Sequence, residues 1–297
     1  MRLKLEGIYP AMLTPFTKNG VHVDYDRAAA LATRLADQGV HGLFVAGTTG
    51  EGPLMTLDER KRLLEVVIEA VGKRINVLAH TGCFDTASTI ALSRHAAEAG
   101  AVLAGVIAPG FFGYDDAALK QHYKAVAKAV EGFPVFLYNL PSCAKNALSP
   151  DLVIELAEQV DNIAGIKDSS EDMTVLSRIL AGAPKDFTII NGVDAYSYQA
   201  YLAGAKGSVT STANVFPELF LKIFANVRKG NLKRAWQVQT RLTQTCSVFR
   251  YGAMAGLYKE ALRLRGFDPG YVRSPQREAS SPEKRALARE LGALGLV

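Results

Sequence analysis

The sequence predicts a (β/α)8 barrel, an α/β fold of the TIM-barrel type, followed by a C-terminal helical extension. Two observations lead to this prediction. Eight short apolar runs alternate with amphipathic helical patterns over the first 228 residues, and only helical patterns follow them. Such alternation indicates parallel strands joined by crossover helices, and eight units fit a closed barrel of about 250 residues. We therefore expect a barrel over residues 1–228 that carries the active site, and a helical extension over residues 229–297.

The expected strands are apolar runs that are too short to form helices. They lie at residues 7–13, 42–47, 75–80, 105–110, 134–139, 163–168, 187–192 and 207–211. An open doubly wound sheet is the alternative, but that fold usually has fewer strands and a GxGxxG turn after the first one. No such turn follows residues 7–13, so the barrel is favoured.

The helical patterns carry apolar residues at three-and-four spacing. Within the barrel they are clearest at 58–73, 88–101 and 150–160, and several of them end on a glycine, as at Gly72 and Gly100. No Pro/Gly/Ser linker precedes the extension, so we expect its helices to pack on the barrel. These helices are expected at residues 231–250, 254–266 and 281–295.

Composition excludes several classes of protein. The net charge is +5, but the charges are dispersed and no run of about five like charges occurs, so we expect no nucleic-acid or lipid partner. The three cysteines, Cys83, Cys143 and Cys246, are far apart, which disfavours a disulfide framework or a thiolate zinc site. No window approaches about eighteen apolar residues, and the first residues do not resemble a signal peptide. We expect a cytoplasmic protein.

In barrel enzymes the chemistry lies at the carboxyl ends of the strands. Lys167 ends the apolar run at 163–168, although lysine is costly to bury. Two interpretations are open: a lysine that extends along the surface to solvent, or an amine held in a dry pocket where it attacks a carbonyl. Tyr138 and the pair Thr48 and Thr49 end two other runs, so we expect all four residues to share one mouth.

These residue types suggest one chemistry. A desolvated lysine condenses with the ketone of a 2-oxo acid, and the resulting iminium accepts an electron pair. The Gly-Thr-Thr-Gly turn at 47–50 offers N–H groups and hydroxyls to the adjacent carboxylate, and Tyr138 can transfer protons to and from the substrate oxygen. Each residue alone also fits a structural role, as a tight loop or a half-buried aromatic. Their combination favours the functional interpretation.

Three segments occur in the order "GTTGEGPLMTLDERKRLL", "YNLPS" and "GIKDSSEDM". Together they resemble the dihydrodipicolinate synthase / N-acetylneuraminate lyase family of class I aldolases, and the likeness runs nearly end to end. The resemblance implies a covalent Schiff base between Lys167 and pyruvate, with no other cofactor and no metal. It also implies carboxylate binding by Thr48 and Thr49, a proton relay through Tyr138 and Thr48, and a pyruvate pocket lined by Val209. A homotetramer built as a dimer of dimers is the assembly that it implies.

The chain departs from the synthase pattern at the second substrate. Synthases of this family carry an arginine after the YN-x-PS motif, which holds the carboxylate of aspartate semialdehyde. Cys143 stands there, and a thiol cannot form that bidentate pair. Lys145 is either a partial substitute or a solvated loop residue. The interface tyrosine that many relatives use in the relay aligns with Phe111, while Tyr114 is close enough to supply the hydroxyl after a loop shift.

Other positions match the family's sugar-acid lyases. Gly192 and Asp194 correspond to positions that meet hydroxyls of the aldehyde half, and Ser211 corresponds to a further hydroxyl-binding position. Ala195 replaces the lyase's glutamate. Asp194 either binds a hydroxyl or caps the helix that starts there. A site without a guanidinium, but with an aspartate and a serine, suits a neutral polyhydroxy aldehyde better than an anionic one, and the absence of the arginine is the stronger of these observations.

We expect a class I aldolase/lyase that reversibly cleaves a 2-keto-3-deoxy sugar acid, or a related 4-hydroxy-2-oxo acid, to pyruvate and an aldehyde. The alternatives are dihydrodipicolinate synthase, a dehydratase of deoxy-keto sugar acids, a metal-dependent aldolase, and a barrel that only binds a 2-oxo acid. The metal enzyme is disfavoured because His80 alone among the histidines ends a strand, and no HxH or HxxxH pair occurs. The lysine, tyrosine and threonine set disfavours a binding protein.

Overall fold

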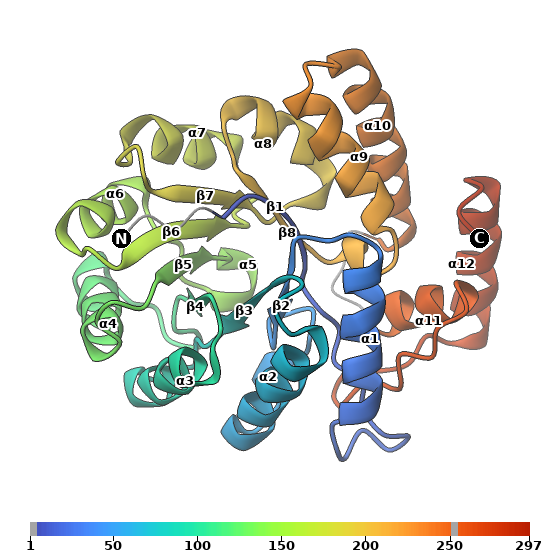
Figure 1. Cartoon of the computed structure of the whole chain (residues 1–297), viewed down its shortest axis with the longest axis horizontal. Coiled ribbons are helices and arrows are strands. Elements are labelled where there is room, and N and C mark those ends of the chain that lie inside the picture. Colours follow the sequence, from blue (N-terminus) through green and yellow to red (C-terminus); the bar gives the residue numbers. More distant parts are fainter. Residues whose placement is uncertain (1–4, 251–254) are drawn as a thin grey trace.

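The structure is a computed structural model that describes residues 5–250 and 255–297. Its centre is a barrel of parallel strands, and helices surround the barrel on its outer face (Figure 1). The TIM barrel that the sequence predicts is thereby confirmed. The strands are β1 (Gly7–Pro10), β2 (Gly42–Val45), β3 (Asn76–His80), β4 (Leu103–Ile107), β5 (Val135–Asn139), β6 (Ile163–Asp168), β7 (Thr188–Asn191) and β8 (Gly207–Thr210).

The sheet closes on itself between β1 and β2. Along the sheet the strands follow the order β1-β8-β7-β6-β5-β4-β3-β2, with all pairs parallel. At the seam, the His41 N–H donates to the Ile8 carbonyl at 3.0 Å, and the Met12 N–H donates to the Phe44 carbonyl at 2.9 Å. Closure of this kind leaves no long sheet edge available for another chain.

Side chains alternate between the barrel interior and the layer beneath the helices, as the two-residue period of a strand requires. On β5, Phe136 and Tyr138 belong to the inner cluster, whereas Val135 and Leu137 belong to the outer one. The inner cluster is small and crowded: a Cβ at Gly165 would lie 2.4 Å from the Phe136 ring. The described residues that fill the interior are Leu5, Tyr9, Ala11, Phe44, Leu78, Leu103, Phe136, Tyr138, Ile190 and Val209.

The barrel helices begin at side-chain caps. The Asp24, Asp85 and Asp115 carboxylates accept backbone N–H groups of the first turns, and Thr56 forms a capping box with Glu59. These caps determine the residue at which each of these helices begins after the preceding loop. The helices are α1 (Tyr25–Asp37), α2 (Leu57–Val71), α3 (Thr86–Ala99), α4 (Asp116–Ala129), α5 (Pro141–Ala144), α6 (Pro150–Gln159), α7 (Met173–Gly182), α8 (Ser197–Ala203) and α9 (Pro217–Arg228), with short 3₁₀ turns η1 (Gly52–Leu54), η2 (Asp194–Tyr196) and η3 (Thr212–Asn214).

One expected strand was misplaced by a few residues. The sequence predicted a strand at 105–110, whereas β4 spans Leu103–Ile107. The run cannot continue in the sheet because Pro109 has no N–H to donate to a neighbouring strand.

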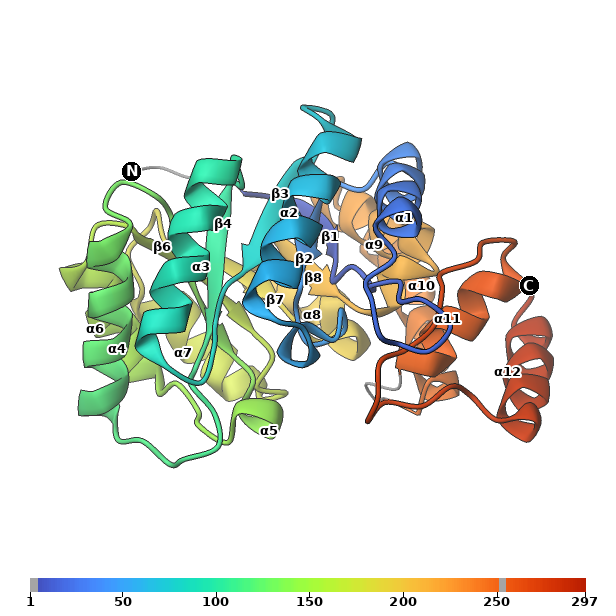
Figure 2. The ribbon, with the colours of Figure 1, turned by 90° about the horizontal axis from the view of Figure 1, so that it is seen from below.

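The extension consists of α10 (Leu232–Val248), α11 (Ala255–Leu264) and α12 (Ser281–Ala293), which lie together on one side of the barrel (Figure 1, Figure 2). Met254, at the start of the helix expected over 254–266, lies outside the described residues. α10 packs along α9 and against η2, and α11 contacts η3. Within the described part of the chain, no helix combines the length and the apolar character that a membrane span requires.

Candidate active site

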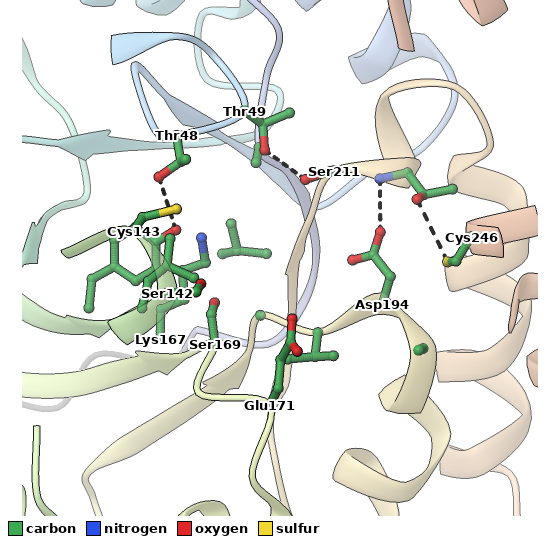
Figure 3. Close-up of a pocket in the computed structure, with 18 of the residues that line it drawn as sticks. Thr48, Thr49, Ser142, Cys143, Lys167, Ser169, Glu171, Asp194, Ser211 and Cys246 are labelled. Atoms are coloured by element: carbon green, nitrogen blue, oxygen red, sulfur yellow. Dashed lines mark hydrogen bonds between the residues drawn. The ribbon is translucent and has the colours of Figure 1, made fainter. Parts of the chain in front are cut away.

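A cavity of about 340 Å³ opens at the carboxyl ends of the strands (Figure 3). It is framed by the segments that follow β2, β5, β6, β7 and β8, as expected for a TIM barrel. The cavity brings together all the residues that the sequence analysis predicted for the site, namely Lys167, Tyr138, Thr48, Thr49, Gly192, Asp194, Val209 and Ser211.

Lys167 extends from β6 into this cavity. Its side chain is only 7% exposed, and its Nζ lies 3.8 Å from the centre of the Tyr138 ring and 4.9 Å from that of Phe44. No carboxylate of the described residues forms an ion pair with it. The amine therefore lies against the Tyr138 and Phe44 rings and faces the cavity. The alternative interpretation, a side chain that extends along the surface to bulk solvent, does not describe this structure.

A pair of hydroxyls lies beside the amine. The Tyr138 hydroxyl is 3.4 Å from the Thr48 hydroxyl, and either oxygen can donate to the other. Tyr138 ends β5, while Thr48 belongs to the loop that follows β2. The two hydroxyls therefore connect the end of β5 to the threonine loop at the edge of the cavity.

The Gly-Thr-Thr-Gly loop is fixed against β1 and β8. The Thr49 hydroxyl is 2.6 Å from the Ser211 hydroxyl, and the Thr14 hydroxyl donates to the Gly50 carbonyl at 2.6 Å. A Cβ at Gly50 would lie 2.5 Å from the Met12 carbonyl oxygen, so only glycine fits there. The loop can present backbone N–H groups and hydroxyls to an anion with little reorganisation.

A buried ion pair between Lys259 and Glu51 supports the Gly-Thr-Thr-Gly loop. The Lys259 Nζ donates to Glu51 Oε1 at 2.8 Å and to the Thr14 carbonyl at 2.7 Å, and the Arg273 N–H donates to Glu51 Oε2 at 2.9 Å. Both charged side chains are at most 1% exposed. Burial raises the pKa of the Glu51 carboxyl, and Lys259 opposes this change. Burial likewise lowers the pKa of Lys259, and Glu51 opposes it. The extension thus helps to position the threonine loop.

Asp194 lines the cavity and holds a neighbouring turn. Its Oδ2 accepts the Thr212 N–H at 2.9 Å, whereas no side chain caps η2, the turn that starts at Asp194 itself. Burial raises the pKa of the Asp194 carboxyl, and hydrogen bonds from Thr212 and the Thr210 side chain oppose the change. The carboxylate therefore ties the end of β7 to the end of β8.

Gly192 occupies a position that excludes any side chain. Its N–H donates to the Asp168 carbonyl at 2.7 Å, and a Cβ there would lie 1.8 Å from the Ser169 Oγ. At this point the cavity is therefore bordered by the backbone of Gly192.

His80 lies behind the site and does not line the cavity. Its Nδ1 is 3.0 Å from both the Ala46 carbonyl oxygen and the Arg60 guanidinium, and its ring packs edge-on against Tyr138. Burial, followed by the charges of Arg60 and Lys167, lowers the pKa of His80 well below its usual value. Across 5–250 and 255–297, no group of three His, Cys, Asp or Glu side chains is placed to hold a metal ion.

The model of the dihydrodipicolinate synthetase family matches residues 4–294. The chain belongs to the dihydrodipicolinate synthetase family. Members of this family are pyruvate-dependent lyases, and the chain is an enzyme of that class.

Relatives within the dihydrodipicolinate synthetase family cover nearly the whole chain. It is 36% identical to an uncharacterised DapA-like lyase of Halobacterium salinarum, over 99% of this chain and 96% of the relative. It is 38% identical to the 4-hydroxy-tetrahydrodipicolinate synthase of Symbiobacterium thermophilum, over 97% of each. It also resembles the crystal structure of YagE, a prophage protein of this family from E. coli K12 in complex with pyruvate, with a TM-score of 0.95, 31% identity, and coverage of 99% and 100%.

The structure places the residues at which the sequence analysis expected a departure from the synthases. Cys143 lines the cavity, while Lys145 is exposed and does not. Neither Phe111 nor Tyr114 lines the cavity of its own chain. Lys167 is the one cation among the described lining residues.

Sequence reasoning missed several lining residues. Ser169 and Glu171 follow Lys167 in the chain, and their place directly after a site residue was the available signal. Cys246 of α10 and Tyr258 of α11 also line the cavity, although the sequence analysis assigned the active site to the barrel. No local pattern marks them, because they reach the cavity only when the extension packs on the barrel.

Proposed function

We propose that this enzyme forms a Schiff base between Lys167 and pyruvate, and that it reversibly cleaves a 2-keto-3-deoxy sugar acid, or a related 4-hydroxy-2-oxo acid, to pyruvate and a neutral aldehyde. One observation carries this proposal: the buried Lys167 amine faces the cavity over the Tyr138 ring, beside the Tyr138 and Thr48 hydroxyls. An amine in such surroundings is suited to attack a ketone.

The reaction balances with the groups of this site. The Lys167 amine attacks the C2 ketone, water leaves, and an iminium forms. The C3–C4 bond then breaks, its electron pair enters the iminium system to give an enamine, and the Tyr138 oxygen takes the proton from the C4 hydroxyl as the aldehyde forms. A proton returned to C3 and hydrolysis of the iminium release pyruvate. No redox partner and no further cofactor is consumed.

The threonine loop is suited to the carboxylate of pyruvate. Thr48 and Thr49 lie on a loop held by Thr14 and by the Glu51–Lys259 pair, so their N–H groups and hydroxyls are preorganised. In the proposal these groups bind the carboxylate, and Val209 packs against the methyl end of pyruvate.

The aldehyde half of the cavity has hydroxyl partners and no guanidinium. Gly192, Asp194 and Ser211 border it, and Cys143 stands where a synthase would hold an arginine. Because a thiol cannot bind a carboxylate in bidentate fashion, this half suits a neutral polyhydroxy aldehyde better.

A second candidate is 4-hydroxy-tetrahydrodipicolinate synthase, which condenses pyruvate with aspartate semialdehyde. It is favoured by the 32% identity to the Methanopyrus kandleri enzyme of that name, over 100% of this chain and 99% of that relative. In this case the carboxylate of aspartate semialdehyde would need a partner other than residue 143.

The proposal includes a cytoplasmic homotetramer. Support for assembly comes from aromatic side chains that are unusually exposed for a single chain, with Phe84 at 67%, Phe111 at 75% and Phe112 at 63%. Contiguous exposed apolar side chains commonly mark a surface that meets another protein.

The deciding experiment is intact-mass spectrometry after addition of pyruvate and sodium borohydride. We expect a mass gain that matches one reduced pyruvate in the wild type and in Lys145→Ala, whose exposed lysine does not line the cavity, and no gain in Lys167→Ala. An unmodified wild-type protein would overturn the proposal. With the adduct established, turnover of aspartate semialdehyde but not of glyceraldehyde would favour the synthase.

A further inference from the structure

The loop after β6 brings an acidic side chain to the cavity. Glu171 follows Lys167 by four residues, is exposed, and lines the cavity. In Figure 3 its side chain rises from the loop, between Ser169 and Asp194 in that view. No hydrogen bond or ion pair joins its carboxylate to another described residue. The carboxylate is therefore available to a ligand in the cavity.

The backbone conformation at Glu171 is unfavourable for a residue with a side chain. Its φ is +61°, in the left-handed region that glycine adopts readily and other residues adopt at a cost of roughly 1–2 kcal/mol. A strained non-glycine residue at the edge of a cavity is a reason to look for a role of its side chain. The lining of the cavity suggests what that role is.

A second polar group near Glu171 lacks a partner. Ser169 is 6% exposed and lines the cavity, and its buried hydroxyl makes no hydrogen bond to any described residue. A buried hydroxyl without a partner is unfavourable, and a polar ligand would supply the missing hydrogen bond. A carboxylate that accepts and a hydroxyl that donates or accepts are together suited to the hydroxyls of a polyol.

The charges of the cavity also favour a neutral aldehyde. Once pyruvate is bound, the iminium on Lys167 and the pyruvate carboxylate neutralise one another. Glu171 and Asp194 are then the remaining carboxyls of the lining, and Lys145 is exposed outside it. Among the described residues that line the cavity, Lys167 is the only cation. A second carboxylate on the incoming aldehyde would meet repulsion without a compensating cation.

We propose that Glu171 determines the aldehyde specificity of this enzyme: its carboxylate accepts hydrogen bonds from the hydroxyls of a polyhydroxy aldehyde and repels aldehydes that carry a carboxylate. This inference rests on the proposed function and deepens it, since it names the residue that selects the substrate class. Glu171 acts on binding and orientation of the aldehyde, and the bond-making groups remain Lys167 and Tyr138.

The test compares two aldehydes at saturating pyruvate. D-glyceraldehyde is neutral and hydroxylated, and succinate semialdehyde carries a carboxylate without an amine. The variants are Glu171→Gln, which removes the charge but keeps the shape, and Glu171→Gly, which also removes the strain. Glu131→Gln is the matched control, because Glu131 is an exposed glutamate that does not line the cavity.

We expect the kcat/KM ratio of glyceraldehyde to succinate semialdehyde to fall about tenfold or more in Glu171→Gln, which corresponds to about 1.4 kcal/mol. The ratio should remain unchanged in Glu131→Gln. In the wild type, discrimination should weaken as salt is added, because an exposed charge is screened. An unchanged ratio in both Glu171 variants would overturn the inference.

Two outcomes separate this inference from the proposed function. If the wild type forms no borohydride-trapped adduct with pyruvate, the Schiff-base proposal is refuted and, with it, the role of Glu171. If the adduct forms but neither aldehyde is turned over, calorimetric titration of the pyruvate-loaded enzyme with the same two aldehydes replaces kinetics. Equal affinity ratios in the wild type and Glu171→Gln would then overturn the inference while leaving the Schiff base intact.

Discussion

Lys167 and Tyr138 occupy paired positions on the adjacent strands β6 and β5, and the Lys167 Nζ lies 3.8 Å from the centre of the Tyr138 ring. Residues in register on neighbouring strands place their side chains on the same face of the sheet. The backbone hydrogen bonds of the barrel therefore hold the amine and the phenol together. In the proposed reaction, the two groups act on the same substrate in different steps, so they can be tested separately.

Replacement of Tyr138 by phenylalanine should separate Schiff-base formation from turnover. The variant keeps the ring that contacts Lys167, Phe44 and His80, and it removes only the hydroxyl. We expect the borohydride-trapped pyruvate adduct to form still, while kcat falls by about 10²–10⁴-fold, the usual contribution of a general acid–base group. Trapping followed by mass spectrometry and steady-state kinetics measure the two effects. Wild-type kcat in this variant would contradict the relay.

Disruption of the Glu51–Lys259 pair should weaken both stability and pyruvate binding. Glu51→Gln leaves the Lys259 ammonium buried without its counter-charge, and we expect the free energy of unfolding to fall by about 3–5 kcal/mol. The KM for pyruvate should rise, because the threonine loop loses its support. Chemical denaturation and pyruvate titrations provide the two measurements.

The exposed Arg178–Asp151 pair is the matched control for this prediction. Its atoms are 2.9 Å apart, but its side chains are 55% and 81% exposed, so Asp151→Asn should change the free energy of unfolding by no more than about 1 kcal/mol. Comparable small losses in Glu51→Gln and Asp151→Asn would show that the buried pair does not support the loop.

A methyl group at Gly192 should distort the cavity. In Gly192→Ala the added Cβ would lie 1.8 Å from the Ser169 Oγ and 2.9 Å from the Asp168 carbonyl oxygen. We expect a loss of about 1–3 kcal/mol in the free energy of unfolding and a larger KM for the aldehyde. Gly113→Ala is the control, since its Cβ would meet no atom within 4 Å. Thermal unfolding and kinetics of both variants check this, and equal behaviour would refute it.

His122 should make the fold sensitive to mild acid. Burial lowers the pKa of His122 to about 4, with Asp85 opposing the shift, from an ordinary value of 6.5. Between these values the unfolded chain binds more protons than the folded one, so stability falls as the pH drops from 6.5 towards 4. This group alone accounts for a loss of up to about 3 kcal/mol by pH 4.

The comparison of His122→Gln with the wild type isolates this effect. Denaturation at pH 7 and pH 5 should show a smaller pH-dependent loss in His122→Gln, since the other buried histidines contribute to both proteins. His22→Gln, at an exposed position, should behave as the wild type. An unchanged loss in His122→Gln would contradict the assignment.

The sequence predicted the fold and the centre of the site, because both depend on local patterns. An apolar run that ends in Lys167, another in Tyr138 and a third in Thr48 are visible along the chain, and parallel strands bring their carboxyl ends to one face. Positions at the ends of such runs therefore identify the cavity without knowledge of the packing. A local feature also explains the error at β4, where Pro109 ends the strand earlier than the apolar run does.

The tertiary structure alone decided what surrounds these residues. Lys259 pairs with Glu51 across 208 positions of sequence, and Asp194 holds the Thr212 N–H instead of capping its own turn. The exposed Glu171, whose own φ lies in the left-handed region, lines the cavity beside Ser169. Periodicity records which side of a strand or helix is apolar, and this is a property of near neighbours in sequence. Pairing between distant charges depends on how the extension packs on the barrel, which only the folded chain specifies.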